Sequence, residues 1–495
     1  MILRDKIIIV GGGSAGWMSA ATLIKAFPEK DITVIESPNT PTVGVGESTI
    51  GSINDWLSFL ELEDKDWMPH VGASYKLSIK FTDFYKKGEE FHYPFGLPYE
   101  PYINNDTRNK WYIKKHLQNC KTSDYAECIA PQIALSNTNK MAKSFDTFDY
   151  HKDAAYHFDA LLFAKYLKNN YCLPRGVKHI EEHINTIETN EHGITSLNNK
   201  HTANLYLDCT GFKSMLMKEV DGEFINMNHI LPNDSAWSTK LDYTDKEKQL
   251  EPYTNCTAID NGWVWNIPQW QKIGTGYVYS SKYIDDVQAL QDFQNYLGKP
   301  KDVNYKHTRM RIGRHKQMWK KNVCSIGLAA GFIEPLESTG LLQTHGFLLT
   351  LVKNLERGKV SQFDKDTHNL ECNDIFDNFV AFVAMHYSLS HRNDTQYWRD
   401  VTNKSIAELE LVQKVMKVKH IDHYFTIDGG MHYIATGMNY DPISMTDILT
   451  RQYEVETDTI DENYVAEFDI NKNRWKENAL LAPTLYKFLK ENIYE

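Results

Sequence analysis

Residues 6–16 read KIIIVGGGSAG, in which four apolar residues lead directly into a glycine-rich turn. The turn has the pattern G-x-G-x-x-G, and residues with helical apolar spacing follow it as far as Pro28. A second apolar segment, 32–35, ends in Glu36. In such an arrangement glycines allow a tight turn, the helix N-terminus faces a pyrophosphate, and the acid binds ribose hydroxyls. The order strand, turn, helix, strand, acid predicts a Rossmann-like dinucleotide site, for FAD or NAD.

Composition narrows the class of protein. The chain has 495 residues, 42% of them hydrophobic and 24% charged, which is typical of a globular protein. A net charge of −11 argues against an extended nucleic-acid or anionic-membrane surface. The seven cysteines include no C-x-x-C pair, and no signal peptide or membrane-spanning segment is apparent. We therefore expect reduced thiols and a cytoplasmic protein.

Glycine-rich segments recur at 11–16, 44–49, 208–211 and 327–340. Sheet-like stretches separate them, so the sequence predicts one interrupted nucleotide-binding domain at 1–60, 151–215 and 320–355. Substrate-binding insertions are expected at 61–150 and 216–319. A mainly helical region is expected at 356–495.

Residues 331–342, GFIEPLESTGLL, place two acids inside an apolar run. Buried acids are rare unless paired or functional. The segment is either a turn before a helix, with Ser338 or Thr339 as N-cap, or a functional site.

Other stretches admit structural and functional interpretations. Residues 74–81, SYKLSIKF, alternate polar and apolar residues and predict one strand, on which both lysines are expected to be solvated if they have no function. Residues 98–150 are polar and expected to be rich in turns, and helical periodicity is expected over 155–167. The strand predicted at 274–281 is expected to pair with the strand predicted at 263–268. Residues 179–183, HIEEH, match a zinc-protease pattern, but turns and strand-like alternation around them argue against a metal site. Cys209 is expected to be buried rather than reactive.

Several motifs, taken together, resemble the flavin-dependent halogenases of the tryptophan-halogenase-like type. The W-x-W-x-I-P motif is the most specific, because general flavin hydroxylases share the glycine pattern but typically lack it. The similarity runs in family order from residue 5 to about residue 345 and continues more weakly through 386–398. The matching stretches are GGGSAGWM (11–18), GVGEST (44–49), SYKLSIKF (74–81), HFDA (157–160), DCTG (208–211), WVWNIP (263–268), GTGYVYSS (274–281), RIGRHKQMW (311–319) and FIEPLESTG (332–340).

The resemblance implies an α/β fold with an FAD-binding Rossmann-like domain of the aromatic-hydroxylase (glutathione-reductase-like) type, an interwoven β-rich substrate domain and a helical C-terminal part. It implies halogenation of an electron-rich aromatic by reduced FAD, O2 and halide, through hypohalous acid. Lys76, and not Lys80, matches the lysine that holds this oxidant. Glu337 matches the glutamate that assists the substitution, whereas Glu334 matches no assigned role and is expected to cap.

The remaining site residues also follow from the resemblance. The halide would bind at Thr339 and Gly340, and the substrate pocket would include Tyr93, Phe95, Trp263 and Trp265. Tyr93 stands where tryptophan-specific members carry histidine, and the aromatic C-terminal lid is shorter after Tyr424. The FAD-binding residues would be Gly11, Gly13, Ser14, Ala15, Gly16, Glu36, Gly46, Glu47, Ser48 and Gly327.

With one dinucleotide pattern visible, reduced FAD is expected from a separate NAD(P)H-dependent flavin reductase. Indoles, phenols and other small aromatics, free or carrier-tethered, are open as substrates. The alternative functions are a flavin-dependent aromatic monooxygenase and a non-catalytic flavin-binding protein.

Overall fold

The computed structural model describes residues 6–38, 47–102, 105–404, 430–440 and 462–495. The chain forms two compact units, each assembled from three separate segments. The first unit consists of Met1–Ala73, Phe158–Ala236 and His307–Val380. The second consists of Ser74–His157, Trp237–Lys306 and Ala381–Glu495. The domain boundaries expected from the sequence remain predictions.

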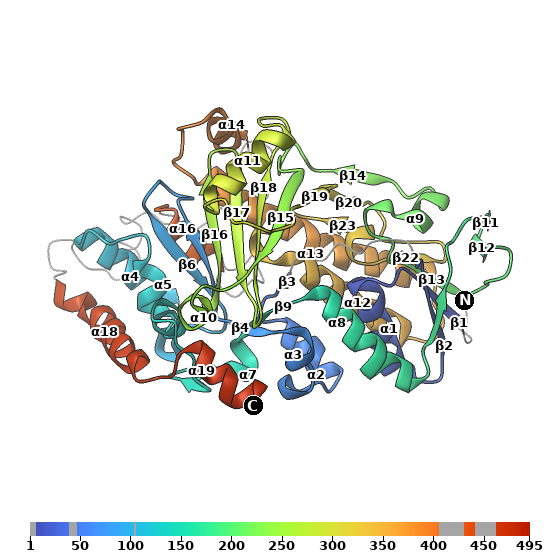
Figure 1. The fold of residues 1–495 in the computed structure, drawn as a ribbon, viewed down its shortest axis with the longest axis horizontal. Helices are drawn as coiled ribbons and strands as arrows, with labels where there is room; N and C mark the ends of the chain where they lie inside the picture. Colours follow the sequence, from blue (N-terminus) through green and yellow to red (C-terminus); the bar gives the residue numbers. More distant parts are fainter. Residues whose placement is uncertain (1–5, 39–46, 103–104, 405–429, 441–461) are drawn as a thin grey trace. The chain divides into compact units, whose positions relative to one another are not determined.

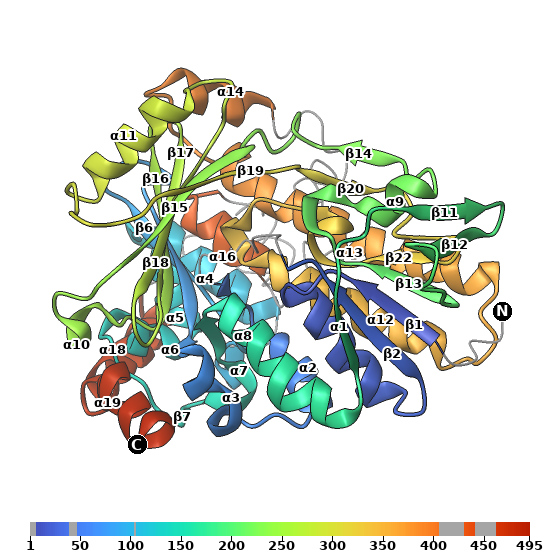
Figure 2. The ribbon, with the colours of Figure 1, turned by 45° about the vertical axis from the view of Figure 1, so that its right-hand side comes forward.

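A mostly parallel sheet forms the centre of the first unit (Figure 2). The inner strands of this sheet are mostly apolar and buried, as expected where both faces of a sheet are covered, whereas the edge strand 178–181 is polar and partly exposed. This arrangement confirms the predicted Rossmann-like α/β fold. In spatial order the strands are β10 (Lys178–Glu181), β2 (Asp31–Glu36), β1 (Lys6–Val10), β13 (Leu205–Asp208), β22 (Val323–Ser325) and the antiparallel β21 (Trp319–Lys320).

Three helices of the first unit pack together beside this sheet (Figure 1). Helix α1 (Ser14–Ala26) begins directly after the glycine turn and contacts both α8 (Ala160–Tyr166) and α12 (Thr339–Leu355). It ends before Pro28, in keeping with the steric limit that a proline places on the preceding residue. The first turns of α1 and α12 belong to the predicted cofactor and halide segments.

The main sheet of the second unit is largely antiparallel, and helix α11 (Asp286–Tyr296) covers part of it (Figure 1). The predicted pairing of 263–268 with 274–281 is confirmed, because β17 and β18 run antiparallel over their whole length. The neighbouring strands, in order, are β15 (Ser235–Leu241), β18 (Ile273–Tyr279), β17 (Gly262–Pro268), β16 (Tyr253–Ile259), β5 (Ser78–Thr82) and β6 (Glu90–Pro94).

The prediction of one strand over 74–81 is wrong. The chain forms β4 (Ser74–Lys76) and β5, which pair with different strands. The break lies at Leu77, whose N–H donates to Pro252 O at 2.7 Å and whose carbonyl accepts from Phe95 N at 2.9 Å. Both backbone groups of Leu77 are thus bonded outside the β4 ladder, and the strand cannot continue in one sheet.

The expected helix over 155–167 is also only partly correct. Residues Ala155–Phe158 form strand β9, which pairs with β4. Asp159 then accepts hydrogen bonds from Leu161 N and Leu162 N and so caps α8. The side-chain cap, rather than the apolar periodicity, fixes where this helix begins.

The C-terminal part is helical, as predicted. Of the helices in the described residues, none is long and apolar enough to cross a membrane. The stretch 98–150, expected to be rich in turns, instead includes α4 (Asn105–Leu117), α5 (Asp124–Ile129) and α6 (Gln132–Asn137). The later helices include α13 (Gln362–Ser388), α14 (Gln396–Lys404), α16 (Gly430–Gly437), α18 (Ala466–Leu480) and α19 (Leu485–Leu489).

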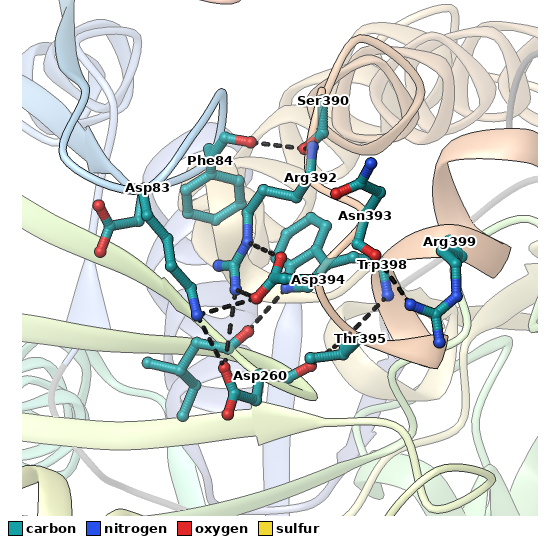
Figure 3. Close-up of polar contacts among 12 residues, drawn as sticks. Asp83, Phe84, Asp260, Ser390, Arg392, Asn393, Asp394, Thr395, Trp398 and Arg399 are labelled. Carbon is teal, nitrogen blue, oxygen red and sulfur yellow. Dashed lines mark hydrogen bonds and ion pairs between the residues drawn. The ribbon is translucent and has the colours of Figure 1, made fainter.

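A buried arginine anchors the loop between α13 and α14 (Figure 3). Arg392 Nε and Nη2 donate to the two carboxylate oxygens of Asp394 at 3.0 and 2.8 Å. Its guanidinium carbon lies 4.5 Å from the centre of the Trp398 ring. Trp398 Nε1 donates to the carbonyl of Ile259 in β16 at 2.8 Å. These contacts fix the helical segment against the sheet of the second unit.

Candidate functional site

The glycine turn after β1 is built so that no side chain fits inside it. Gly11 has φ +115°, and a Cβ there would lie 2.3 Å from the Cys209 carbonyl oxygen. A Cβ on Gly16 would lie 1.9 Å from the Gly11 carbonyl oxygen. Gly11 N donates to Ile35 O at 2.9 Å, which holds the turn at the ends of β1 and β2. The turn therefore has the close packing that a dinucleotide-binding loop requires.

Glu36 lies beside this turn, as a ribose-binding acid should. Its Oε2 is 3.0 Å from His179 Nε2 and 3.5 Å from Lys168 Nζ. A Cβ on Gly12 would lie 2.1 Å from the Glu36 carboxyl carbon, so the Glu36 side chain would have to move if Gly12 were replaced. His179 is on strand β10 and His183 contacts Ser37, so these histidines do not share a helix face as the zinc-protease pattern requires.

The turn after β22 meets the start of α1. Gly327 has φ +64°, and a Cβ on it would lie 2.7 Å from Ala15 Cβ. Ser14 Oγ donates to Ala160 O at 3.0 Å, which joins α1 to the start of α8. Cys209 is buried, as expected, and burial raises the pKa of its thiol to about 12. The predicted residues Gly13, Ser14, Ala15, Gly16 and Gly327 belong to two turns that the fold packs together.

Two further predicted segments of the first unit also meet. Ser338 Oγ donates to Ser48 Oγ at 3.1 Å. Glu47 Oε2 would lie 3.9 Å from a Cβ placed on Gly340. Burial, and then the charge of Asp159, raise the pKa of Glu47 to about 7. Glu47 and Ser48 thus lie at the first turn of α12, whereas Gly46 is outside the described residues.

The two acids of 331–342 are both buried but have different surroundings. Glu334 is fully buried, and its Oε2 accepts a 2.6 Å hydrogen bond from Asn233 Nδ2. It takes the N-cap position of the short 3-10 helix Pro335–Glu337, as expected, but its side chain makes no cap hydrogen bond there. Glu337 is 1% exposed, at the end of the short 3-10 helix Pro335–Glu337. Ser338 takes the N-cap position of α12 without a side-chain cap bond.

Lys76, in the second unit, is completely buried. Its Nζ lies 4.6 Å from the centre of the Phe95 ring, and Phe95 packs edge-on against Tyr93 at 5.7 Å. The solvated alternative is therefore wrong for Lys76. Lys80 fits that alternative only in part, because its side chain is 19% exposed and its Nζ pairs with Glu90 at 2.7 Å. Lys76, the lysine that matches the family motif, is thus more deeply buried than Lys80, which does not match it.

His157 is a residue to which the sequence assigned no role. It is fully buried on β9, with Nδ1 3.1 Å from Pro268 O and Nε2 2.8 Å from Thr254 Oγ1. A carbonyl only accepts, so Nδ1 carries the proton and Nε2 accepts from the hydroxyl. Burial, and then the charge of Lys76, hold the pKa of His157 well below its usual value. A neutral histidine thus ties β9, next to β4, to the main sheet.

Trp263 and Trp265 lie on one side of β17, with ring centres 6.1 Å apart and little exposure to solvent. A Cβ on Gly276 of the paired strand would lie 2.2 Å from the Trp265 ring, so the glycine makes room for it. Tyr93 lies against α16, where a Cβ on Gly430 would be 2.9 Å from its hydroxyl. The predicted lid residues at 424–425 lie outside the described residues.

A family model described as "Tryptophan halogenase" matches residues 6–450. The chain belongs to this family. It is thus an enzyme of the flavin-dependent halogenase class, and the glycine turns described above fit the FAD on which this class depends.

Individual relatives agree with this assignment. Tryptophan 6-halogenase SttH from Streptomyces toxytricini is 34% identical over 435 residues, which cover 82% of each chain. Tryptophan 7-halogenase RebH from Lentzea aerocolonigenes is 33% identical over 434 residues, which cover 83% of this chain and 81% of RebH. The solved apo structure of VirX1 aligns with a TM-score of 0.91, at 36% identity and 99% coverage of both chains.

Proposed function

We propose that this chain halogenates an electron-rich aromatic small molecule, with FADH2, O2 and halide, through hypohalous acid held by Lys76. The observation that carries the proposal is the complete burial of Lys76 against Phe95. An ammonium is rarely buried fully unless it is paired or functional. Lys80, four residues further along the chain, is by contrast partly exposed, and its Nζ pairs with Glu90 at 2.7 Å.

Lys76 can act on the oxidant in two ways. As an ammonium it hydrogen-bonds to hypohalous acid and polarises the oxygen–halogen bond. As a neutral amine it captures the halogen covalently as a haloamine, and partial desolvation makes the neutral form accessible to buried lysines in general. Either route keeps a diffusible oxidant at a fixed place.

Glu337 supplies the negative charge that the substitution needs. The halogen forms its bond to a ring carbon while the oxygen–halogen bond breaks, and the oxygen leaves as hydroxide, which takes a proton from the Lys76 ammonium to become water. The ring then carries positive charge until it loses a proton. A buried carboxylate stabilises that charge and accepts the proton. Glu334 accepts a hydrogen bond from Asn233 and is assigned a structural role in this proposal.

The first unit provides the sites for cofactor and halide in this proposal. FAD, when bound, supplies the two electrons that activate O2 for reaction with halide. Thr339 and Gly340 begin α12, where backbone N–H groups lack intrahelical acceptors and suit an anion. The FAD-binding residues are those of the turns described above, Gly11, Gly13, Ser14, Ala15, Gly16, Glu36, Glu47, Ser48 and Gly327, together with Gly46.

The substrate and partner are inferred from the same family. SttH and RebH are named as tryptophan halogenases, so tryptophan and other indoles are the first substrates to test. Tyr93, Phe95, Trp263 and Trp265 would form the aromatic pocket. Reduced FAD would come from a separate NAD(P)H-dependent flavin reductase. If purified chain with NADH alone sustained turnover, the two-component arrangement would be wrong.

The direct test compares Lys76→Ala with Lys80→Ala as the matched control. Both variants are incubated with FAD, a flavin reductase, NADH, halide and an indole, and products are identified by mass spectrometry. Lys76→Ala should lose halogenated product and still consume O2 to form hydrogen peroxide. Lys80→Ala should retain the product. A hydroxylated product that Lys76→Ala still forms would favour an aromatic monooxygenase instead.

A further inference from the structure

The first turns of α12 contain two buried hydrogen-bond donors that the protein leaves unused. Thr339 is fully buried and Gln343 is 2% exposed. Across the described ranges, neither Thr339 Oγ1 nor Gln343 Nε2 has a hydrogen-bond partner. Other polar side chains of the same helix are bonded: Thr344 Oγ1 donates to Gly340 O and Asn354 Nδ2 to Thr350 O. Buried polar groups are seldom left unpaired, so the two donors indicate a ligand.

The two donors lie on the same face of α12. Residues four apart in a helix share one face, and helical side chains lean towards the N-terminus. The side chain of Gln343 is therefore long enough to reach the turn that begins with Thr339. Ser338 gives this helix no side-chain cap bond, so its side chain does not close the turn. A side-chain amide, a hydroxyl and helix N-terminal N–H groups can thus reach one position.

We propose that Gln343 Nε2 donates a hydrogen bond to the halide bound at Thr339 and Gly340, and that Gln343 thereby sets halide affinity. This inference rests on the halide placement in the proposed function. A halide only accepts hydrogen bonds and carries a negative charge, which matches a site made of donors at the positive end of a helix. The oxygen and nitrogen of the Gln343 amide can exchange places by a half-turn of the terminal bond, so Nε2 can face the anion.

The test uses Gln343→Met, which keeps side-chain length without the donor, and Thr344→Val as a control on the next residue. Hydrogen bonds to charged groups are strong enough that KM for bromide should rise roughly ten- to a hundredfold in Gln343→Met. Neither kcat at saturating bromide nor KM for the aromatic substrate should change by a comparable factor. Thr344→Val should leave KM for bromide unchanged. If Gln343→Met does not fold, Gln343→Asn, whose amide is one methylene too short, should give the same rise.

Bromide placement gives a second readout that needs no turnover. Anomalous diffraction from crystals grown with bromide should show the ion in contact with Thr339, Gly340 and Gln343 Nε2, at reduced occupancy in Gln343→Met. Bromide bound at the turn with unchanged occupancy and KM in the variant would overturn the role of Gln343 and leave the halide site intact. A loss of FAD affinity without a change in KM for bromide would likewise overturn it. Halogenated product without bromide at this turn would overturn the halide placement itself.

Discussion

The Nζ atom of Lys76 lies 4.6 Å from the centre of the Phe95 ring, and neither side chain is appreciably exposed to solvent. The ring face offers negative electrostatic potential to the ammonium, which offsets part of the cost of removing that charge from water. Phe95 thus stabilises the position of Lys76 in addition to any contact with substrate.

The first prediction concerns this ring. Phe95→Leu should lower kcat for halogenation about fivefold, since a cation–π contact contributes roughly 1 kcal/mol. Phe91→Leu is the matched control, because Phe91 is a buried ring on β6, which ends directly before Phe95, and it stacks on Phe81 and not on a lysine. Product yield per reduced flavin is measured by chromatography. Equal losses in the two variants would contradict a specific role for the ring beneath Lys76.

A second prediction separates the two buried acids. Glu337→Gln should lower kcat by about two to four orders of magnitude and leave the unfolding temperature nearly unchanged, because it removes a proton acceptor but keeps size. Asn233→Ala should instead lower the free energy of unfolding by roughly 1–3 kcal/mol, since it deprives the Glu334 carboxylate of a 2.6 Å hydrogen bond. Calorimetry and steady-state kinetics on both variants check this. The reverse pattern would exchange the roles of Glu334 and Glu337.

The third prediction is a pH dependence at Glu47. Its pKa is raised from 4.5 to about 7, so the native protein holds a proton there that the unfolded chain releases near pH 4.5. The contribution of Glu47 to stability therefore falls as pH rises from about 4.5 to 7. Above pH 7 a carboxylate beside Gly340 repels an anion, and Asp159 is the charged neighbour that adds to the effect.

The measurement is KM for bromide against pH. In the unsubstituted protein KM should rise above pH 7, and in Glu47→Gln the profile should be flatter over the same range. The KM of the aromatic substrate serves as the internal control. A parallel rise in both proteins would show that another group titrates.

A fourth prediction concerns stability of the second unit. Asp394→Asn should destabilise it by about 2 kcal/mol, because the Arg392 guanidinium, whose side chain is 1% exposed, loses the nearer of two charged partners and keeps only Asp260 at 3.8 Å (Figure 3). Asp242→Asn should cost less than about 1 kcal/mol, because its pair with Lys272 is at the surface. Denaturant unfolding of both variants is the measurement. Equal effects would mean that the Arg392 pair contributes no more than a surface pair.

Short-range sequence patterns predicted the first strand, turn and helix of the first unit correctly. The strand 6–10, the glycine turn and the helix after it follow from apolar runs and from backbone freedom, both of which act over a few residues. The pairing of β17 with β18 was accessible for the same reason. These elements required no knowledge of distant contacts.

The burial of a side chain could not be predicted from the sequence where the residues that cover it are distant in the chain. The alternation of 74–81 is the same whether Lys76 faces water or the Phe95 ring, and only pairing with β9 and β6 distinguishes the cases. The assignment of Lys76 came from resemblance, not from periodicity. His157 was missed because its partners, Thr254 and Pro268, lie about 100 residues away in the chain. Gln343 was missed because its single distinguishing feature is a buried donor without a partner.

Mass spectrometry of products shows whether Lys76 directs an oxidant made from halide onto an aromatic ring. The unsubstituted protein and Lys76→Ala are each incubated with FAD, reductase, NADH, a panel of indoles and phenols, and chloride, bromide or iodide in turn. We expect halogenated product from the unsubstituted protein with at least one halide, and none from Lys76→Ala, which should still form hydrogen peroxide. Halogenation at an undiminished rate by folded, flavin-binding Lys76→Ala would contradict this role of Lys76.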